Sequence, residues 1–173
     1  RLRIVTKYNN IDSFLDINHN NHTKFRFSIN TRYIIKKFEH NTSSFEERIE
    51  AARKISKAGY PLGFIIAPIM IYDNWQKDYR ELLDKLKSEL EGYEEKITFE
   101  LIQHRFTNTA KELILKRFPK TELDLNEENR QLKWGPYGKF KHVYPKEKSN
   151  EIRDYISQII NENFLNAEIE YFT

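Results

Sequence analysis

The sequence predicts an α/β fold in which parallel strands are joined by crossover helices. Segments with the alternation typical of strands follow one another along the chain, separated by segments with the apolar spacing of helices. Residues 62–70 are nearly all apolar, which indicates a strand covered on both faces. The pattern changes after Pro119, where an irregular acidic stretch leads into a β-hairpin. An open sheet and a barrel both fit this order.

Composition narrows the class of protein further. The 173 residues are 39% hydrophobic and 32% charged, a balance that fits one globular domain. No apolar run approaches the ~20 residues of a membrane span. The sequence has no cysteine, which excludes disulfides and thiolate metal sites within these residues. A net charge of +3 does not by itself indicate nucleic-acid binding. Because the chain opens without Met and in a strand-like pattern, we expect it to be part of a longer protein.

The first half of the chain predicts two strands and two helices before residue 60. Residues 2–7 and 24–30 alternate as strands do, and residues 11–17 form a short helix capped by Asn10. A second helix begins after Ser43 or Ser44, because apolar residues then recur at helical spacing. Gly59 ends that helix.

The second half continues the alternation and then departs from it. After the strand at residues 62–70, the sequence predicts an amphipathic helix at 75–90, a strand at 97–104 and a helix at 109–118. Two strands around a Gly-Pro-Tyr-Gly turn make residues 130–144 a hairpin. A helix at 149–164 and a strand at 167–172 complete the chain.

Polar residues on one side of the early strands indicate a cleft or a barrel lumen. Lys24, Arg26, Ser28 and Asn30 alternate with apolar residues that would pack on helices. Ligands of parallel α/β folds bind at the carboxyl ends of strands, where Lys7, Ser28 and Asn30 are expected. The ammonium of Lys7 suits a carboxylate or phosphate. The alternative is an edge strand whose polar face is simply hydrated.

Two further features have competing interpretations. Gly63 and Ala67 are small residues on one face of a strand, which could let a flat ligand ring approach the backbone, although core packing explains them more simply. His104 stands at a strand end, where it either makes a structural hydrogen bond or takes part in function.

The hairpin has the most specific composition in the chain. Its aromatic and basic residues are interleaved: Trp134, Tyr137, Phe140 and Tyr144 with Arg130, Lys133, Lys139, Lys141 and His142. Aromatic rings stack on bases, and basic side chains hold phosphates. The alternative is a hairpin that packs its aromatics on the barrel and keeps its lysines outside for solubility. A Tyr at the turn favours nucleic-acid contact, because core packing is least expected at the tip.

Several motifs together resemble the spore photoproduct lyase family. The matching stretches are FRFSIN at 25–30, GYPLGFIIAPI at 59–69, ITFELIQHRFT at 97–107, KWG at 133–135, YG at 137–138 and IEYFT at 169–173. They extend over essentially the whole chain and correspond to the second half of a family member.

The resemblance implies a fold and a reaction. The fold would be the C-terminal part of a partial (β/α)6 radical SAM barrel, with residues 1–119 as the second half of the barrel. Residues 120–173 would be a C-terminal extension that contacts DNA through the hairpin at 130–144. In this family a [4Fe–4S] cluster, reduced by an electron donor, cleaves S-adenosylmethionine (SAM). The 5′-deoxyadenosyl radical then acts on the spore photoproduct, a thymine dimer, and two thymines are restored.

The resemblance also implies roles for individual residues and a setting. Lys7, Ser28 and Ala67 would hold SAM, Lys7 by its carboxylate, and Val5 would line the lesion pocket. The expected DNA contacts are Trp134, Tyr137, Gly138 and Lys139, with Tyr137 entering the duplex beside the flipped lesion. The partner would be lesion-containing double-stranded DNA. We expect a monomer without membrane association in the cytoplasm of a spore or germinating cell.

Two departures from the family pattern limit what this chain can do. The family's C-x3-C-x2-C cluster motif and its hydrogen-returning cysteine are both missing here. Pro136 also stands where relatives carry a basic residue, which affects the expected contact at the tip. We therefore expect the chain to supply SAM- and DNA-binding parts and to be inactive alone. The alternative is a non-catalytic α/β module that binds nucleic acid.

Overall fold

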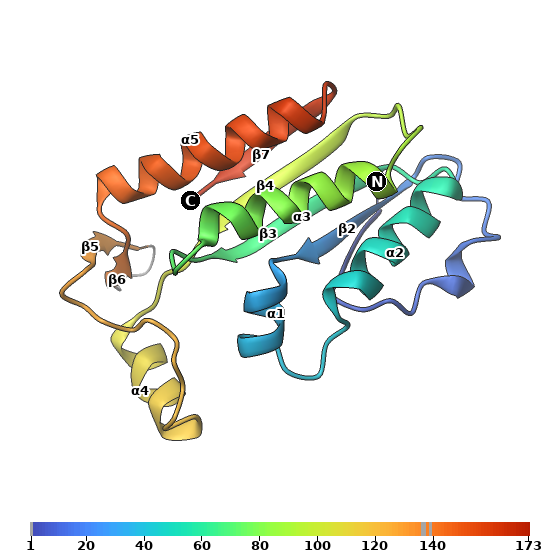
Figure 1. Ribbon diagram of the computed structural model, residues 1–173. Coiled ribbons are helices and arrows are strands. Elements are labelled where there is room, and N and C mark those ends of the chain that lie inside the picture. Colours follow the sequence, from blue (N-terminus) through green and yellow to red (C-terminus); the bar gives the residue numbers. More distant parts are fainter. Residues whose placement is uncertain (1, 136–137, 139) are drawn as a thin grey trace.

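The computed structural model, which describes residues 2–135, 138 and 140–173, contains a five-stranded sheet in which every neighbouring pair is parallel (Figure 1). The strand order is β1-β2-β3-β4-β7. The strands are β1 Leu2–Thr6, β2 Thr23–Ile29, β3 Leu62–Ile69, β4 Ile97–Gln103 and β7 Ala167–Phe172. This confirms the predicted α/β class. β1 and β7 are the edges, so the described strands form an open sheet.

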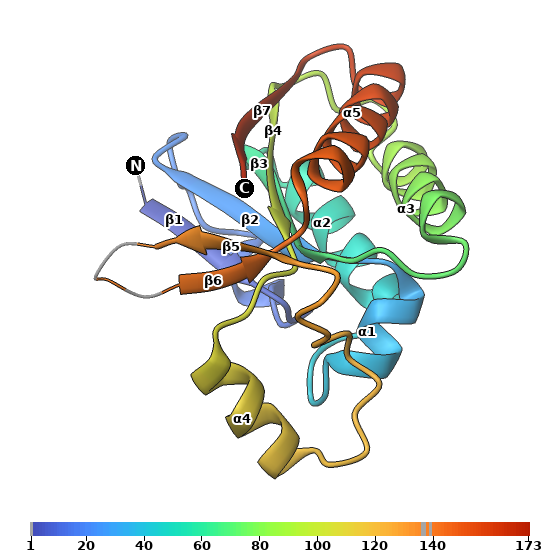
Figure 2. The same ribbon diagram turned by 90° about the vertical axis from the view of Figure 1, so that its left-hand side faces the viewer.

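Three helices cover one face of the sheet: α2 Phe45–Lys57, α3 Trp75–Glu89 and α5 Lys146–Asn163. Figure 2 shows them on one side, with the hairpin of β5 (Gln131–Trp134) and β6 (Phe140–Val143) projecting on the other. The apolar strand residues that face these helices are almost fully buried, among them Phe25, Phe27, Phe64, Phe99 and Leu101. Their burial is the main stabilising contribution to the fold.

Local capping explains where two of the helices begin. The Ser44 hydroxyl accepts a hydrogen bond from the Glu47 amide, and the Glu47 carboxylate accepts one from the Ser44 amide, which is a capping box for α2. Gly59 has a φ of +78°, as a helix-terminating glycine requires. A further helix, α1 (Arg32–Phe38), was not predicted; Thr31 caps it by accepting from the Ile34 amide.

Two predicted helices differ from those observed. The predicted helix at 11–17 is only a 3-10 turn, Asp12–Phe14, and its N-cap is Ile11 rather than Asn10. None of the turn's residues is buried, so it lacks the apolar face that would stabilise a longer helix. Helix α5 begins at Lys146, earlier than predicted, because Pro145 is well suited to the residue that precedes a first turn.

The segments after β4 carry the two remaining features. α4 (Asn108–Arg117) has no buried residue and stands apart from the helical layer (Figure 1). β5 and β6 pair antiparallel, as the hairpin prediction requires, and β7 returns to pair with β4. Among the helices of the described residues, none has both the length and the apolar character needed to cross a membrane.

Candidate functional site

The register of the sheet places the predicted cofactor residues on one face. Val5 pairs with Arg26, and Arg26 pairs with Gly63, so these residues share the face opposite the helices. Residues two or four positions further along the same strands lie on that face as well. This polar face therefore carries three of the predicted site residues near the carboxyl ends of the strands: Val5, Ser28 and Ala67. Lys7 follows the last residue of β1, Thr6, and so lies at the same edge of the sheet.

Lys7 and Ser28 have the chemistry that an amino-acid group requires. The Lys7 Nζ lies 3.0 Å from a Glu39 carboxylate oxygen, and the lysine side chain remains 37% exposed. An ammonium has three donors, so this cation keeps donors for another anion. Ser28 is buried, and its hydroxyl makes none of the side-chain hydrogen bonds found among the described residues. Lys7 and Ser28 therefore offer donors to an anionic ligand at this edge of the sheet.

Asn30 does not belong to this polar face, contrary to the sequence-based expectation. It follows the end of β2 and is fully buried on the helical side. Its Nδ2 donates to the Pro68 carbonyl at 2.8 Å, and the Tyr79 hydroxyl donates to its Oδ1 at 3.1 Å. Burial raises the pKa of Tyr79 well above its usual value, which keeps this donor protonated. Asn30 therefore connects the strand ends to α3.

Nearer the amino ends of the strands, the polar face carries a network of charged side chains. Arg26 pairs with Glu100 and with Glu170, and Lys24 Nζ donates to Thr98 Oγ1 at 2.5 Å. Burial lowers the pKa of Lys24, and the nearby Glu170 opposes that shift.

Gly63 lies between the strands that supply this network. A Cβ at Gly63 would lie 2.7 Å from Thr98 Oγ1 and 3.1 Å from Lys24 Cε. The absence of a side chain at Gly63 therefore makes room for the contact between Lys24 and Thr98, rather than for a ligand ring.

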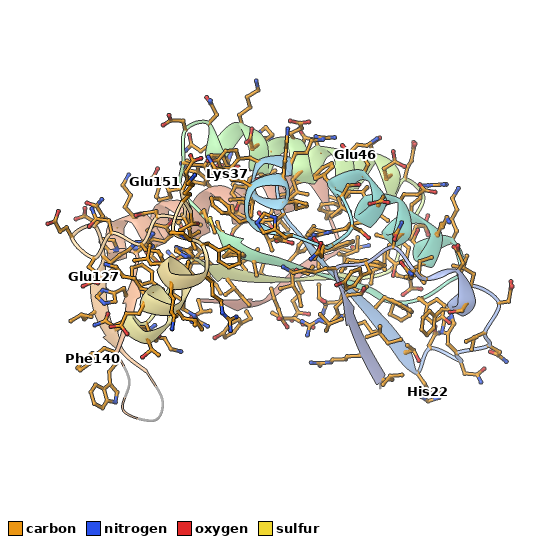
Figure 3. The ribbon with its side chains drawn as sticks, turned by 90° about the horizontal axis from the view of Figure 1, so that it is seen from below. His22, Lys37, Glu46, Glu127, Phe140 and Glu151 are labelled. Carbon is orange, nitrogen blue, oxygen red and sulfur yellow. The ribbon has the colours of Figure 1, made fainter. Side chains whose placement is uncertain are left out.

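The hairpin presents aromatic side chains to solvent. Trp134 is 63% exposed and Phe140 is 50% exposed, and their rings meet edge to face at 4.6 Å. Figure 3 shows Phe140 beside the turn of the hairpin. Gly138 has a φ of +72°, a conformation suited to glycine. The predicted contacts of Tyr137 and Lys139, and the position of Pro136, lie outside the described residues.

The base of the hairpin is fixed to the end of β4. Phe106 and His142 exchange backbone hydrogen bonds, and their rings stack with centroids 5.0 Å apart. Arg130 donates to the His104 carbonyl at 3.2 Å. Burial, and secondarily the charge of Arg130, lowers the pKa of His104 to about 4. His104 is therefore neutral near pH 7, and its Nδ1 lies 3.4 Å from Arg130 Nη2, which supports the structural interpretation. Tyr144 is buried here as well.

A cavity of about 650 Å³ separates the hairpin from the ends of β4 and β7. Its cationic side chains are Arg105, Lys133, Lys141 and Lys146. No Asp or Glu is found among the described residues that line it, so its field favours an anionic ligand. Trp134 and Tyr171 add aromatic surface. Lys146 and Tyr171 were not predicted here, because the last helix was expected to begin only at residue 149 and β7 was not placed next to β4.

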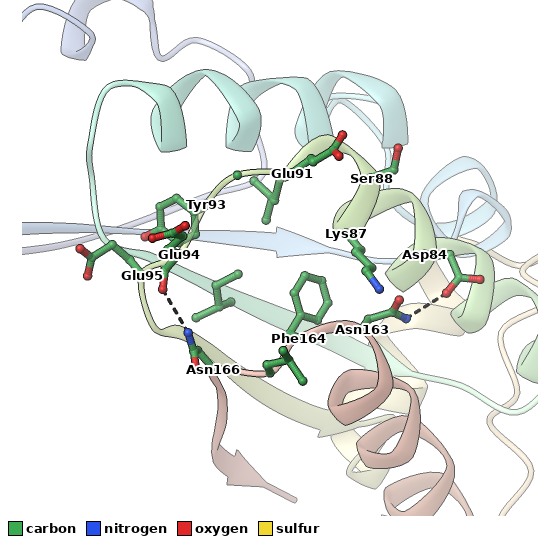
Figure 4. Close-up of a pocket in the computed structure, with 14 residues that line it drawn as sticks. Asp84, Lys87, Ser88, Glu91, Tyr93, Glu94, Glu95, Asn163, Phe164 and Asn166 are labelled. Carbon is green, nitrogen blue, oxygen red and sulfur yellow. Dashed lines mark hydrogen bonds between the residues drawn. The ribbon is translucent and has the colours of Figure 1, made fainter.

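A second cavity, of about 830 Å³, lies at the opposite ends of the strands (Figure 4). It is lined by residues from the ends of α3 and α5 and the turn between α3 and β4, and its rim is acidic. Asn166 donates to the Glu94 carbonyl across it. It shares no residue with the predicted site. In the part of the chain that the structure describes, no three His, Asp or Glu side chains are grouped to hold a metal ion.

Comparison with known proteins gives one consistent result. A family model described as "Spore photoproduct lyase" matches residues 1–173. The chain is 52% identical over 174 residues to a spore photoproduct lyase of Bacillus subtilis (strain 168), covering 100% of this chain and 51% of the relative. It is 50% identical to one from Geobacillus sp. (strain Y412MC61), with the same coverage.

Solved structures agree with the sequence matches. A spore photoproduct lyase mutant with bound AdoMet and dinucleoside spore photoproduct superposes with a TM-score of 0.95 and 51% identity, covering 100% of this chain and 51% of that one. A spore photoproduct lyase complexed with dinucleoside spore photoproduct gives the same values. The chain thus spans about half the length of the relatives it matches.

Proposed function

Because the chain belongs to the spore photoproduct lyase family, we propose that it is the SAM- and DNA-binding part of a DNA repair lyase. The reaction would revert the spore photoproduct thymine dimer to two thymines. The observation that carries the proposal is the likeness, over the whole chain, to a solved relative that holds both AdoMet and a dinucleoside spore photoproduct. The polar groups at the strand ends add independent support.

Residues at the carboxyl ends of the strands would bind the cofactor. Lys7 donates to the carboxylate of SAM, the Ser28 hydroxyl contacts the amino-acid end, and Ala67 leaves space for the adenosyl group. Val5 lines the adjacent pocket for the lesion. When bound, SAM would supply the 5′-deoxyadenosyl radical of the reaction.

The residues of this chain do not fit the [4Fe–4S] cluster that the family chemistry uses. The sequence contains no cysteine, and thiolates are the usual cluster ligands. We assign the cluster and the hydrogen-donating cysteine to the half of the relatives' length that this chain does not span. The chain alone is then inactive as a lyase, and the reaction also needs an electron donor.

We assign the two binding functions to two parts of the chain. Residues 1–119 would complete one side of a partial (β/α)6 barrel and hold SAM, and residues 120–173 would hold the DNA. The hairpin supplies Trp134, Tyr137, Gly138 and Lys139 to a double-stranded substrate, and the cationic cavity at its base fits the phosphate backbone. The enzyme would act as a monomer in the cytoplasm of a spore or germinating cell.

A second candidate function is a nucleic-acid-binding module without catalysis. The observation that favours it is the combination of a basic, aromatic hairpin with a sequence that has no cysteine. This candidate requires DNA binding but leaves Lys7 and Ser28 without a ligand.

Two binding measurements separate the candidates. They use a family-length enzyme, meaning a protein of the relatives' full length that contains this chain. Anaerobic equilibrium dialysis measures SAM, and fluorescence anisotropy measures duplex DNA with and without one spore photoproduct. We expect binding of SAM and a preference for the lesion. DNA binding without SAM binding would support the module, and failure to bind either would contradict both candidates.

A further inference from the structure

One buried guanidinium connects the loop after α1 to the carboxyl end of β2. Arg48, on α2, is fully buried. Its Nη1 donates to the Ser28 carbonyl at 3.1 Å, and its Nε donates to the Ser43 carbonyl at 2.9 Å. Its Nη2 donates to the Thr42 hydroxyl at 2.8 Å and to the Glu39 carboxylate at 2.7 Å. Arg48 therefore fixes the backbone at Ser28 and orients Glu39.

Glu39 extends this connection to the end of β1. One carboxylate oxygen, Oε2, accepts from Arg48 and lies 3.0 Å from the Lys7 ammonium. The Glu39 side chain is only 7% exposed, whereas Lys7 is 37% exposed. The other oxygen, Oε1, is buried and has no hydrogen-bond partner among the described residues. Buried Arg48 thus fixes the Glu39 carboxylate, and Glu39 in turn holds Lys7, which solvent can still reach.

The charges of this trio leave Lys7 able to attract an anion. Lys7 and Arg48 are cationic and Glu39 is anionic, so the three side chains together carry one positive charge. A carboxylate beside Lys7 without Arg48 would cancel the lysine's attraction for another carboxylate. Because Arg48 balances Glu39, the net charge stays positive where the strands end.

Holding Lys7 in advance should favour binding. A free lysine side chain loses rotamer entropy when a ligand fixes it. The contact with Glu39 already restricts the flexible stem of Lys7 before a ligand arrives, and prior restriction of this kind raises affinity. The same unit fixes Ser28 through its carbonyl, so both proposed cofactor contacts depend on it.

We propose that Glu39 and Arg48 are positioning residues that hold Lys7 and Ser28 in place for the carboxylate end of SAM. The inference rests on the proposed function and extends it to two residues that the family motifs in the sequence did not single out. The alternative is that Glu39 and Arg48 only stabilise the loop between α1 and α2 and have no specific effect on the affinity for the cofactor.

A ligand lacking the carboxylate separates the two possibilities. Dissociation constants for SAM and decarboxylated SAM are measured by equilibrium dialysis on the family-length enzyme and three variants: Glu39→Gln, Lys7→Ala and the double variant. Glu39→Gln releases the Lys7 side chain, and this loss of prior restriction should weaken SAM binding about tenfold although the local charge becomes more positive. Binding of decarboxylated SAM should change less than about twofold, and Glu39→Gln should have no further effect once Lys7 is replaced.

Controls keep the outcomes distinct. Glu122→Gln removes an exposed carboxylate that pairs with Lys37 of α1, and it should leave both constants unchanged. If Glu39→Gln does not fold, Glu39→Asp serves in its place, because it keeps the charge and shortens the reach. If Glu39→Gln weakens binding of SAM and decarboxylated SAM equally, or if the effects of the two substitutions add in the double variant, the positioning role is overturned. The proposed function is not affected by either result. A parent enzyme that binds no SAM would instead overturn the proposed function and this inference with it.

Discussion

The Arg130 guanidinium lies over the ring of Tyr144, 3.8 Å from its centroid. Arg130 immediately precedes β5 and Tyr144 immediately follows β6, so this contact joins the two ends of the hairpin. The Tyr144 hydroxyl also accepts from the Ile71 amide, and Arg130 pairs with Asp124 at 2.8 Å. The hairpin is therefore fixed at its base, while Trp134 remains exposed toward the turn.

The buried His104 at this base makes stability depend on pH. Because its folded pKa is about 4 and that of an unfolded histidine about 6.5, the unfolded state binds the proton more tightly. Stability is then lost as pH falls from about 6.5 toward 4. We expect the parent chain to lose about 2 kcal/mol between pH 7 and pH 5 beyond any loss in His104→Gln. Urea unfolding of both at the two pH values measures this, and parallel losses would contradict it.

The hairpin tip should carry DNA affinity. Tyr137→Ala should weaken binding of lesion-containing duplex, because a stacking contact is worth about 1–3 kcal/mol. Lys139→Ala should weaken binding. It should also reduce the slope of log affinity against log salt concentration by about one, the value for one lost phosphate contact. Anisotropy titrations at several salt concentrations measure both, with Lys57→Ala on α2 as the control. Unchanged affinity in both hairpin variants would make the hairpin structural.

Lys7 should contribute to cofactor binding. Replacing it with Ala removes a charge-assisted hydrogen bond worth roughly 1.5–3 kcal/mol, so the dissociation constant for SAM should rise about tenfold or more. The measurement is equilibrium dialysis on the family-length enzyme, and affinity for lesion DNA serves as the internal control. A SAM constant equal to that of the parent would remove Lys7 from the cofactor site.

Gly63 should be required by the charge network on the polar face. In Gly63→Ala the new methyl group would lie 2.7 Å from Thr98 Oγ1, so the network must shift. We expect a loss of about 1–3 kcal/mol in unfolding free energy. In a Thr98→Ala background, Gly63→Ala should lower the unfolding free energy by less than it does in the parent, because the hydroxyl nearest the new methyl group is gone. Wild-type stability for Gly63→Ala in chemical denaturation would show that the space is not needed.

The fold could be predicted from sequence where local pattern and burial agree. The apolar alternation of β2 and the capping of α2 by Ser44 are local signals, and both are confirmed. α1 was missed because its seven residues are too few for a clear helical period. The place of β7 beside β4 could not be read locally, because parallel pairing joins segments far apart in the chain.

The candidate site was predictable only in part for a similar reason. The resemblance indicated Lys7 and Ser28. The strand register places Ser28 on the polar face, and Lys7 follows the end of β1. Glu39 and Arg48 were not predicted, since a charged residue on an amphipathic helix or in a loop is ordinarily solvated. Only the folded chain shows that Arg48 is buried and that Glu39 reaches Lys7. Asn30 was misplaced because strand alternation does not continue beyond Ile29.

Recovery of thymine tests the central claim most directly. The family-length enzyme, with its cluster reduced under anaerobic conditions, is incubated with SAM and dinucleoside spore photoproduct, and the products are separated by liquid chromatography with mass detection. We predict that the lesion is converted to two thymine units, with the rate sharply reduced in Lys7→Ala at low SAM concentration. An intact lesion, in enzyme shown to bind both SAM and the dinucleoside, would contradict the assignment of this chain to a spore photoproduct repair lyase.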